Sequence, residues 1–399
     1  MHHWRVFAVL WAALLPCGGC SSMLTRKTAE RQRHLPFPVP ELSDGIPAKR
    51  VCYLQASESL QPESLDVTLC THIICGFADL ANGTLAPRQP EDAAYYVRTT
   101  ALKRVNPSLK VMLSVGGGGS SGLKFTDMVS TNEARTRFLN SAILFLRKYG
   151  FDGLDIDWEF PGQSDPPELD RDNFVHLLKE VFKAFRESPY GPFLLSVAVP
   201  AQSTLAIAYD IPSMARNVDF VNLMTYDLHI FKWYTPLTGH NSPLFSRSDE
   251  LGYFATLNVQ SSTELWTSMG MPKSKIMVGI PTYGLSWVLL NAQSAGVGSV
   301  AIGQSKEGDG FVSYPKVSLR TMLNRSKRLH YDDESMVPFA TKGRTWISYD
   351  DQESVAIKTR WILAQNFSGT MTFSLNSDDW QGTCGHGAFP LQKSILEAT

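Results

Sequence analysis

The stretch Phe151–Phe160 constrains this sequence more than any other, because it holds four acidic residues and no basic one. If it forms a β-strand, successive side chains point to opposite faces. One face then carries acids and the other carries apolar residues: Asp155, Asp157 and Glu159 against Leu154, Ile156 and Trp158. The stretch therefore predicts a strand with one acidic and one apolar face.

Carboxylates on one face of a strand stand about 6–7 Å apart and affect one another's charge. A row of like charges raises the pKa of at least one member, so that a proton is retained. A carboxylic acid that keeps its proton near neutral pH can act as a general acid. We therefore interpret Glu159 as a candidate proton donor.

Two other structures would also account for the acidic row. A solvated acidic edge is common for charge runs, but it does not require apolar residues strictly on the opposite face. A divalent-metal site would also use clustered carboxylates. Here no His stands at ligand spacing and the Gly-spaced pattern of a calcium loop is missing, so we expect neither a metal nor a cofactor.

From Arg50 onward, short apolar runs alternate with longer helical patterns, which is typical of a parallel sheet wound with helices. Eight strands are predicted, at residues 50–54, 71–78, 110–115, 151–160, 193–199, 218–227, 275–283 and 369–375. A capping box formed by Ser130 and Glu133 predicts the start of a helix that Gly150 ends. Between about 287 and 347 strands and turns predominate.

The acids Asp152, Asp155, Asp157 and Glu159 follow the pattern Asp-x-x-Asp-x-Asp-x-Glu. In this motif the sequence resembles the family 18 glycoside hydrolases, the chitinases and chitinase-like lectins, and the stretch 224–229 (MTYDLH) matches a second motif of that family. The resemblance implies an α/β fold, a TIM (β/α)8 barrel with a small α+β insertion domain at about 288–346, between strands seven and eight. It also implies hydrolysis of β-1,4-linked N-acetylglucosamine in chitin or chito-oligosaccharides.

The resemblance further implies a role for each residue of the site. Glu159 would protonate the leaving oxygen, and Asp157 would orient the substrate acetamide that attacks the anomeric carbon. Asp155 would share a proton with Asp157, Tyr226 would hydrogen-bond the acetamide, and Asp152 would be structural. Substrate contacts are expected at Tyr53, Phe77, Gly117, Trp158, Met224, Asp227, Tyr283 and Phe373.

Several positions depart from the family pattern. Gly118 stands where a Trp commonly follows the third strand, Leu285 replaces a common Arg, and Phe373 replaces the Trp of the last strand. Residues 55–60 are polar where an aromatic-rich loop is expected. Because aromatic faces support pyranose rings, these changes imply weaker binding of long chitin or a preference for short or altered oligosaccharides. Trp233 and Trp287 are candidates to compensate.

The glycine run at 116–119 has a second interpretation as a phosphate-binding loop. No Gly-Lys-Ser/Thr follows it, and the acidic partner of a dinucleotide fold is missing. We interpret the run as a loop in which the glycines allow backbone conformations that other residues rarely adopt.

Residues 1–22 have the composition of a signal peptide, because Arg5 precedes the apolar run 6–15 and small residues follow. Ten apolar residues are short for a membrane span, so cleavage is predicted, with a short signal anchor as the alternative. Residues 23–48 are predicted to be a linker or propeptide, and 49–399 the barrel. The expected location is extracellular, or membrane-tethered if the anchor is retained.

Sequons at Asn82, Asn324 and Asn366 agree with secretion. Four cysteines remain after the first 22 residues, too few for a disulfide scaffold. The family resemblance implies a bridge between Cys52 and Cys70. Cys384 matches a second family cysteine whose usual partner position is Val317 here, so it is expected to be unpaired, and Cys75 to be a buried apolar residue.

A composition of 43% hydrophobic and 19% charged residues, with a net charge of −1, fits one large enzyme. The charge balance gives no reason to expect nucleic acid as a partner or stable membrane insertion after processing, and a monomer is expected. Three functions remain open: an endo-acting chitinase, a chitinase-like lectin, and an enzyme acting on another N-acetylated glycan. Glu159 favours an enzyme, because lectin members of the family typically lack it.

Overall fold

The computed structural model describes residues 35–37, 48–162, 165–305, 310–322 and 328–399. The chain divides into two units, Met1–Val39 and Pro40–Thr399. The predicted signal peptide and Asn324 lie outside the described residues, as does nearly all of the predicted linker. No helix in the described part of the chain is long and apolar enough to cross a membrane.

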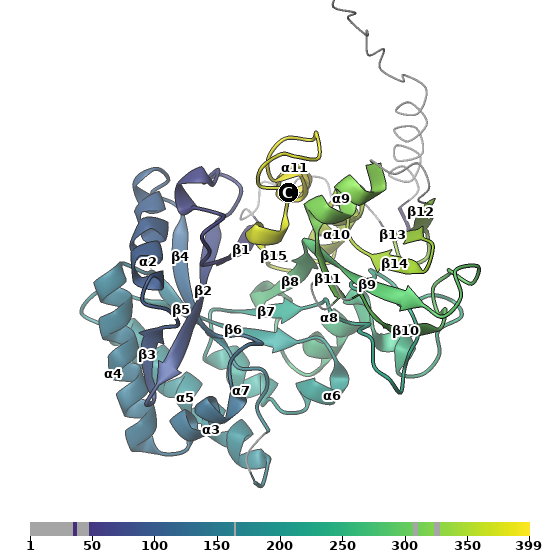
Figure 1. Cartoon of the computed structure of the whole chain (residues 1–399). Coiled ribbons are helices and arrows are strands. Elements are labelled where there is room, and N and C mark those ends of the chain that lie inside the picture. Colours follow the sequence, from purple (N-terminus) through teal and green to yellow (C-terminus); the bar gives the residue numbers. More distant parts are fainter. Residues whose placement is uncertain (1–34, 38–47, 163–164, 306–309, 323–327) are drawn as a thin grey trace, which may run out of the picture. The chain divides into compact units, whose positions relative to one another are not determined.

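The second unit contains a closed barrel of eight parallel strands (Figure 1). These strands are β1 (Lys49–Gln55), β2 (His72–Ala81), β4 (Lys110–Gly116), β5 (Gly153–Asp157), β6 (Leu194–Pro200), β7 (Phe220–Met224), β8 (Ile276–Pro281) and β15 (Gly369–Phe373). They pair in chain order, and β15 pairs with β1 to close the barrel. A short strand, β3 (Thr84–Pro87), extends the sheet antiparallel to β2. The predicted TIM barrel is confirmed.

Helices follow the strands along the chain. They are α2 (Asp92–Ala101), α3 (Gly122–Val129), α4 (Asn132–Tyr149), α5 (Glu168–Glu187), α6 (Ser203–Ala206), α7 (Ile211–Arg216), α8 (Val259–Ser268), α10 (Gln352–Ala364) and α11 (Pro390–Ala398). The apolar residues of α5 recur at helical spacing and are buried: Phe174, Leu177, Leu178, Val181 and Phe185.

The predicted start of α4 is wrong by one residue. Thr131 is the N-cap, and its side chain accepts a hydrogen bond from the backbone N–H of Ala134. Ser130 belongs to the preceding turn, where its hydroxyl donates to the Asp127 carbonyl. The predicted end is confirmed, because Gly150 adopts the left-handed conformation with φ +75°.

Between β8 and β15 the chain builds a second, antiparallel sheet. It comprises β9 (Tyr283–Leu289), β10 (Ala301–Gln304), β11 (Phe311–Ser313), β12 (Arg328–Asp332), β13 (Val337–Lys342) and β14 (Thr345–Ser348), with α9 (Tyr314–Met322). The strand order is β10-β9-β14-β13-β12, and β11 pairs with β9. This sheet occupies the place expected for the insertion domain, although its strands extend beyond the predicted limits, to 283 and 348.

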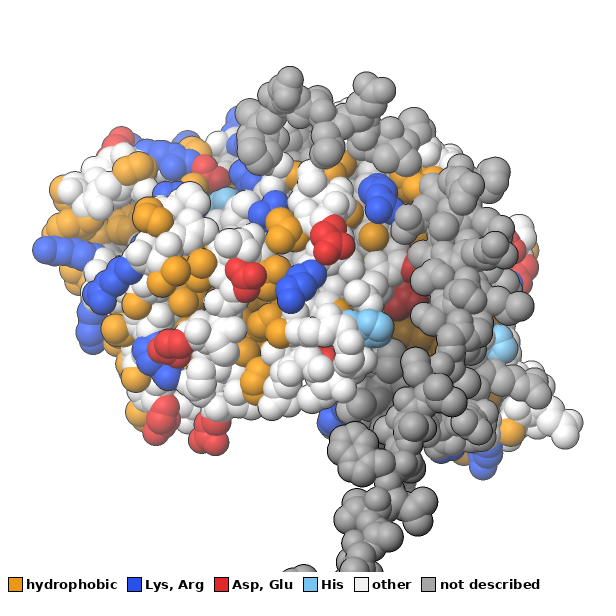
Figure 2. Space-filling model, turned by 90° about the horizontal axis from the view of Figure 1, so that it is seen from above, with side chains coloured by type: hydrophobic (Ala, Val, Ile, Leu, Met, Phe, Trp, Pro, Cys, Tyr) orange, Lys and Arg blue, Asp and Glu red, His pale blue; other side chains and the backbone are white. Residues whose placement is uncertain are grey.

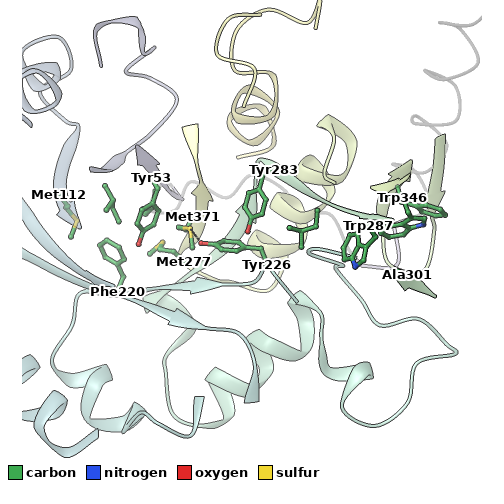
Figure 3. Close-up of a cluster of buried hydrophobic side chains, with 14 of the residues drawn as sticks. Tyr53, Met112, Phe220, Tyr226, Met277, Tyr283, Trp287, Ala301, Trp346 and Met371 are labelled. Carbon is green, nitrogen blue, oxygen red and sulfur yellow. Dashed lines mark hydrogen bonds between the residues drawn. The ribbon is translucent and has the colours of Figure 1, made fainter. Parts of the chain in front are cut away.

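One hydrophobic cluster connects the barrel interior to the second sheet (Figure 3). Met112 and Phe220 lie at its barrel end, Tyr226 and Tyr283 lie in the middle, and Trp287 lies at the far end (Figure 3). Trp287 is only 1% exposed and packs edge-on against Trp346, with 5.1 Å between ring centroids. It is therefore a core residue and does not replace the missing sugar platforms.

The cysteines are arranged as expected. Cys52 and Cys70 form a disulfide that ties β1 to the segment before β2. Cys75 and Cys384 are free and buried. Val317, at the position of the usual partner of the second family cysteine, is fully buried.

The described surface is mixed in charge. On the face shown in Figure 2, Lys and Arg side chains are interspersed with Asp and Glu. Asn82, in the turn between β2 and β3, and Asn366, after α10, are both exposed. Both sequons are therefore accessible in the folded protein.

Replacing both Cys52 and Cys70 by Ser is expected to lower the free energy of unfolding by ~3 kcal/mol. The bridge links residues 18 apart, and its loss gives the unfolded chain more conformational freedom. Equilibrium urea unfolding measures the change. Reductant should bring the parent to the variant's midpoint and leave the variant unchanged, and equal midpoints for the oxidised parent and the variant would contradict the expectation.

Candidate active site

The acidic row lies on β5 and the two residues that follow it. Trp158 is 1% exposed and stacks on Phe125 of α3, with 5.6 Å between ring centroids. It also contacts Phe174 of α5 edge-on. The apolar face of the row therefore packs against the helices, as alternation predicts. The expectation that Trp158 contacts substrate is wrong, because its ring is covered on the helix side of the barrel.

Asp155 is fully buried inside the barrel and accepts four hydrogen bonds. Its donors and distances are Tyr53 Oη at 2.7 Å, Ser114 Oγ at 2.8 Å, Ser196 Oγ at 2.6 Å and Asn222 Nδ2 at 3.0 Å. Ser114 and Ser196 are its register partners on β4 and β6. Burial raises the pKa of Asp155, and these hydrogen bonds oppose the rise.

Asp157 lies one step further along the strand in a different environment. It is 4% exposed, and its Oδ1 has no hydrogen-bond partner among the described residues. Burial raises its pKa well above the ordinary range, and the charges of Glu159 and Asp155 add to the rise. No hydrogen bond between Asp155 and Asp157 is found in the described structure, so the expected proton sharing has no direct contact here. A buried oxygen of this kind indicates a place for a ligand donor or water.

Glu159 ends the row beyond the last residue of β5. Burial raises the pKa of its carboxyl to about 7, and the charge of Asp227 contributes to the rise. A hydrogen bond from the Gly118 backbone N–H opposes it. A carboxyl with a pKa of about 7 can both donate and accept a proton near neutral pH.

Tyr226 and Asp227 follow β7 directly. Asp227 adopts the left-handed conformation with φ +55°, and its backbone N–H donates to Asn241 Oδ1 at 2.8 Å. Its carboxylate accepts from Tyr283 Oη at 2.7 Å. The ring of Tyr226 stacks on Phe373 with 5.9 Å between centroids.

A buried ion pair stabilises the segment that carries Tyr226 and Asp227. Lys358 Nζ contacts Asp350 at 2.6 Å and Ser242 Oγ at 3.1 Å. Ser242 in turn donates to the carbonyl of Thr225 at 2.7 Å, immediately before Tyr226. The contacts fix the backbone that carries Tyr226 and Asp227.

A cavity of about 300 Å³ gathers these groups. Its lining comprises Tyr53, Gln55, Phe77, Arg88, Gly117, Gly118, Gly119, Asp157, Glu159, Met224, Tyr226, Asp227, Tyr283 and Phe373. The lining includes all of the residues at which substrate contacts are expected, except Trp158. Phe373 packs between Tyr53 and Tyr226, with 5.7 Å between its ring centroid and that of Tyr53. The substituted Phe373 thus still supplies an aromatic ring to the cavity.

A larger groove of about 870 Å³ adjoins this acid cavity. Glu159, Met224, Tyr226 and Asp227 line both spaces. The remaining lining of the groove comes mainly from the segments 228–239 and 247–257. Glu159 therefore stands at the boundary between a small acidic cavity and a large groove.

Other expected positions are placed as follows. Asp152 forms an ion pair with Lys103 at 3.0 Å and accepts from the Val111 backbone N–H at 2.8 Å, consistent with a structural role. Leu285 is 8% exposed within β9 and lines neither cavity. No group of three His, Cys, Asp or Glu residues suited to a metal occurs among the described residues.

Sequence reasoning missed two kinds of site residue. Ser114, Ser196 and Asn222 lie inside predicted strands, and alternation together with a barrel model would have pointed them at Asp155. Arg88 follows β3 and gave no signal in the sequence. Its Nη2 donates to the Gly116 carbonyl at 2.5 Å, its guanidinium lies over the ring of Phe77, and its charge lowers the pKa of Asp157.

The raised pKa of Glu159 predicts a pH-dependent stability. Between its ordinary value of 4.5 and about 7, the folded protein retains a proton that the unfolded chain releases, so the free energy of unfolding falls as pH rises. The variant Glu159→Gln does not titrate here and should not lose stability in this way. Between pH 4.5 and about 7, its free energy of unfolding should therefore rise relative to that of the parent by up to ~3 kcal/mol. Urea unfolding at each pH tests this, with exposed Glu187→Gln as control. A constant difference across the window would contradict the expectation.

Comparison with known proteins identifies relatives of this chain. The family model described as glycosyl hydrolases family 18 matches residues 49–378. Chitotriosidase-1 of Mus musculus is 38% identical over 371 residues, covering 88% of this chain and 78% of the relative.

Solved structures of proteins from the same family are also similar to this chain. An immunomodulatory active chitinase from Trichuris suis has a TM-score of 0.83 at 33% identity, covering 88% of this chain and 100% of that one. Human YKL-39, described as a pseudo-chitinase with retained chitooligosaccharide binding, has a TM-score of 0.82 at 32% identity, covering 88% and 99%. Together with the acidic row inside a closed barrel, these matches show that the chain belongs to glycosyl hydrolase family 18.

Proposed function

We propose that this protein hydrolyses β-1,4-N-acetylglucosamine linkages by a substrate-assisted, retaining mechanism. The observation that carries the proposal is the contrast between two neighbouring carboxyls. Glu159 has a pKa of about 7, and Asp157 presents a buried oxygen without a partner among the described residues. This pair supplies a proton donor and an acceptor for an amide N–H, which are the two groups that the mechanism requires.

In the proposed first step, the sugar to be cleaved occupies the acid cavity above Phe373. Glu159 protonates the glycosidic oxygen, and the carbonyl oxygen of the 2-acetamido group attacks the anomeric carbon as the leaving group departs. Asp157 Oδ1 accepts the acetamide N–H and stabilises the positive charge of the oxazolinium ion. The Tyr226 hydroxyl, whose protein contact is Met371 Sδ at 3.8 Å, donates to the acetamide oxygen.

In the second step, Glu159 acts as a base. It has lost its proton to the leaving group and takes one from a water molecule that attacks the anomeric carbon. The ring of the oxazolinium ion opens, the acetamide is restored, and the product keeps its β configuration. Both steps use the same carboxyl, which is why a pKa near neutral is suited to it.

Glu159→Gln is expected to reduce turnover of chitotriose glycosides at least ~100-fold, because general acid catalysis typically contributes that much or more. Binding of chito-oligosaccharides should be retained. A fluorogenic assay measures turnover and calorimetry measures binding, with Glu187→Gln as the matched control. Equal turnover in the parent and Glu159→Gln would contradict the proposal.

The pH profile of turnover follows from the protonation of Glu159. The rate should fall at alkaline pH, approaching tenfold per unit above a pKa of about 7 in the free enzyme. Measurement of kcat/KM across the pH range tests this expectation. A rate that climbs steadily from neutral to strongly alkaline pH would show that a deprotonated group drives the first step.

A lectin is the second candidate function, and the altered positions favour it. A Cβ atom at Gly118 would lie 3.5 Å from both carboxylate oxygens of Glu159, so the family's aromatic side chain would contact the proton donor directly. Because residue 118 is a glycine, no aromatic side chain from this position borders Glu159. Human YKL-39 is a relative that binds chitooligosaccharide as a pseudo-chitinase. Absence of turnover in the parent, with binding retained, would select this candidate.

We further propose an extracellular, monomeric protein that acts on chains internally. The Cys52–Cys70 disulfide and the exposed sequons at Asn82 and Asn366 support passage through an oxidising, glycosylating compartment. The large groove adjoins the acid cavity at Glu159, which leaves room for the substrate chain to continue beyond the cleaved bond on that side. Another N-acetylated glycan would fit the same acetamide chemistry.

A further inference from the structure

Arg88 is the one basic residue in the described lining of the acid cavity. It follows β3 directly and is exposed. Its Nη2 donates to the Gly116 carbonyl at 2.5 Å, and its guanidinium carbon lies 5.6 Å from the centroid of the Phe77 ring. These two contacts hold the guanidinium at the edge of the cavity.

The charge of Arg88 has no acidic partner among the described residues. No ion pair in the described part of the chain includes Arg88, and Asp79 of the adjacent strand β2 is paired instead with Lys124 at 2.6 Å. A guanidinium carries five N–H donors. The described protein accepts from one of these, at Nη2, so Nε and Nη1 are available to a ligand.

The glycine run leaves both Arg88 and the proton donor uncovered. A Cβ atom at Gly119 would lie 3.8 Å from Arg88 Nη1, and one at Gly118 would lie 3.5 Å from both carboxylate oxygens of Glu159. A large side chain at either position would therefore contact one of these two groups. Because the two glycines are consecutive, Arg88 and Glu159 border the same short loop. In a cavity of about 300 Å³, a sugar held beside Glu159 is therefore close to Arg88.

The acids of the cavity do not cancel the charge of Arg88. Burial raises the pKa of Asp157 well above its ordinary range and that of Glu159 to about 7, so both carboxyls retain protons where an ordinary carboxyl is ionised. The Asp227 carboxylate accepts from Tyr283 Oη at 2.7 Å. An anion bound at Arg88 therefore meets less repulsion than three ionised carboxylates would cause.

We propose that Arg88 binds an anionic group, a carboxylate or a sulfate, carried by a sugar next to the β-1,4 linkage that is cleaved. The proposal rests on the function proposed above and names its substrate class, an acidic glycan that contains β-1,4-linked N-acetylglucosamine. The planar guanidinium can donate two parallel hydrogen bonds to the oxygens of such a group. The acidic group is a substituent on the sugar, so the linkage and the internal mode of cleavage are unchanged. Binding by charge would offset part of the stacking that is lost with a glycine at 118.

Two matched pairs of oligosaccharides test the proposal. In the first pair, N-acetylglucosamine is β-1,4-linked to glucuronic acid, as in a hyaluronan octasaccharide, or to glucose, in the same octasaccharide after reduction of its carboxyl groups. In the second pair, chitotetraose carries sulfate on its primary hydroxyl groups or is unsulfated. The acidic member of at least one pair is expected to have a kcat/KM about tenfold higher or more, the size of a charge-assisted hydrogen bond. The pair that shows the preference identifies the anionic group, and no preference in either pair overturns the proposal.

Two Arg88 variants separate binding of an anion from a structural role. In Arg88→Gln, the ratio of acidic to neutral kcat/KM is expected to fall to about one, because Gln keeps an N–H donor for the Gly116 carbonyl but has no charge. Arg88→Lys should keep part of the preference, because it keeps the charge but not the planar fork. Arg104→Gln is the matched control, since Arg104 is exposed and lines neither cavity. A purely structural Arg88 would affect both members of a pair alike, so an unchanged ratio in Arg88→Gln overturns the proposal.

The failure of this proposal is distinguishable from failure of the proposed function. If unsulfated chitotetraose is cleaved and neither acidic member is preferred, the role of Arg88 is wrong and the hydrolase stands. If no compound is cleaved, the hydrolase fails, and calorimetry of the same four compounds still tests Arg88. Tighter binding of an acidic member that is lost in Arg88→Gln supports the anion site, whereas equal affinities or no measurable binding overturn it.

Discussion

The structure depends on one buried carboxylate and the strands that surround it. Asp155 accepts hydrogen bonds from Tyr53 on β1, Ser114 on β4, Ser196 on β6 and Asn222 on β7. A carboxylate in a closed core is costly unless it is hydrogen-bonded. Because the four donors come from four strands, the barrel must be closed correctly before the acid is satisfied, and the acid in turn holds those strands in register.

The next two acids of the row, Asp157 and Glu159, have fewer hydrogen-bond partners in the protein than Asp155. Asp157 is buried but has an oxygen without a partner among the described residues, and Glu159 lies where the cavity meets the groove. The protein therefore donates fewer hydrogen bonds to the two acids nearest the cavity than to Asp155. The retained proton on Glu159 and the open oxygen of Asp157 are consequences of that difference. A stable core and a reactive site are thus built from one alternating segment of sequence.

Much of this arrangement was predictable from local patterns. Alternation in Phe151–Phe160 placed the acids inside the barrel and Trp158 among the helices. The family resemblance nevertheless suggested Trp158 as a substrate contact, and the physical alternation was the better guide. Gly150 marked a helix end correctly, whereas the start of α4 shifted from Ser130 to Thr131, because two adjacent hydroxyl residues compete for one N-cap.

Long-range contacts were beyond the reach of the sequence. Arg88 lies in an edge segment without any periodic pattern, and only the closed barrel brings it to Phe77 and Gly116. The larger groove is likewise assembled mainly from two loops that are separate in the chain. Trp287 seemed a candidate sugar platform because Trp often serves as one, but its strand belongs to the core of the second sheet.

In the proposed mechanism the substrate's own acetamide is the nucleophile, positioned by Asp157 and assisted by Glu159. The most direct test compares two matched aryl glycosides that differ only at carbon 2 of the sugar that is cleaved, one acetamido and one hydroxyl. Turnover of the acetamido glycoside is expected, with at least ~1,000-fold slower turnover of the hydroxyl glycoside, because intramolecular attack is lost. Similar rates for the two would show that a protein group or water attacks, and would contradict the substrate-assisted mechanism.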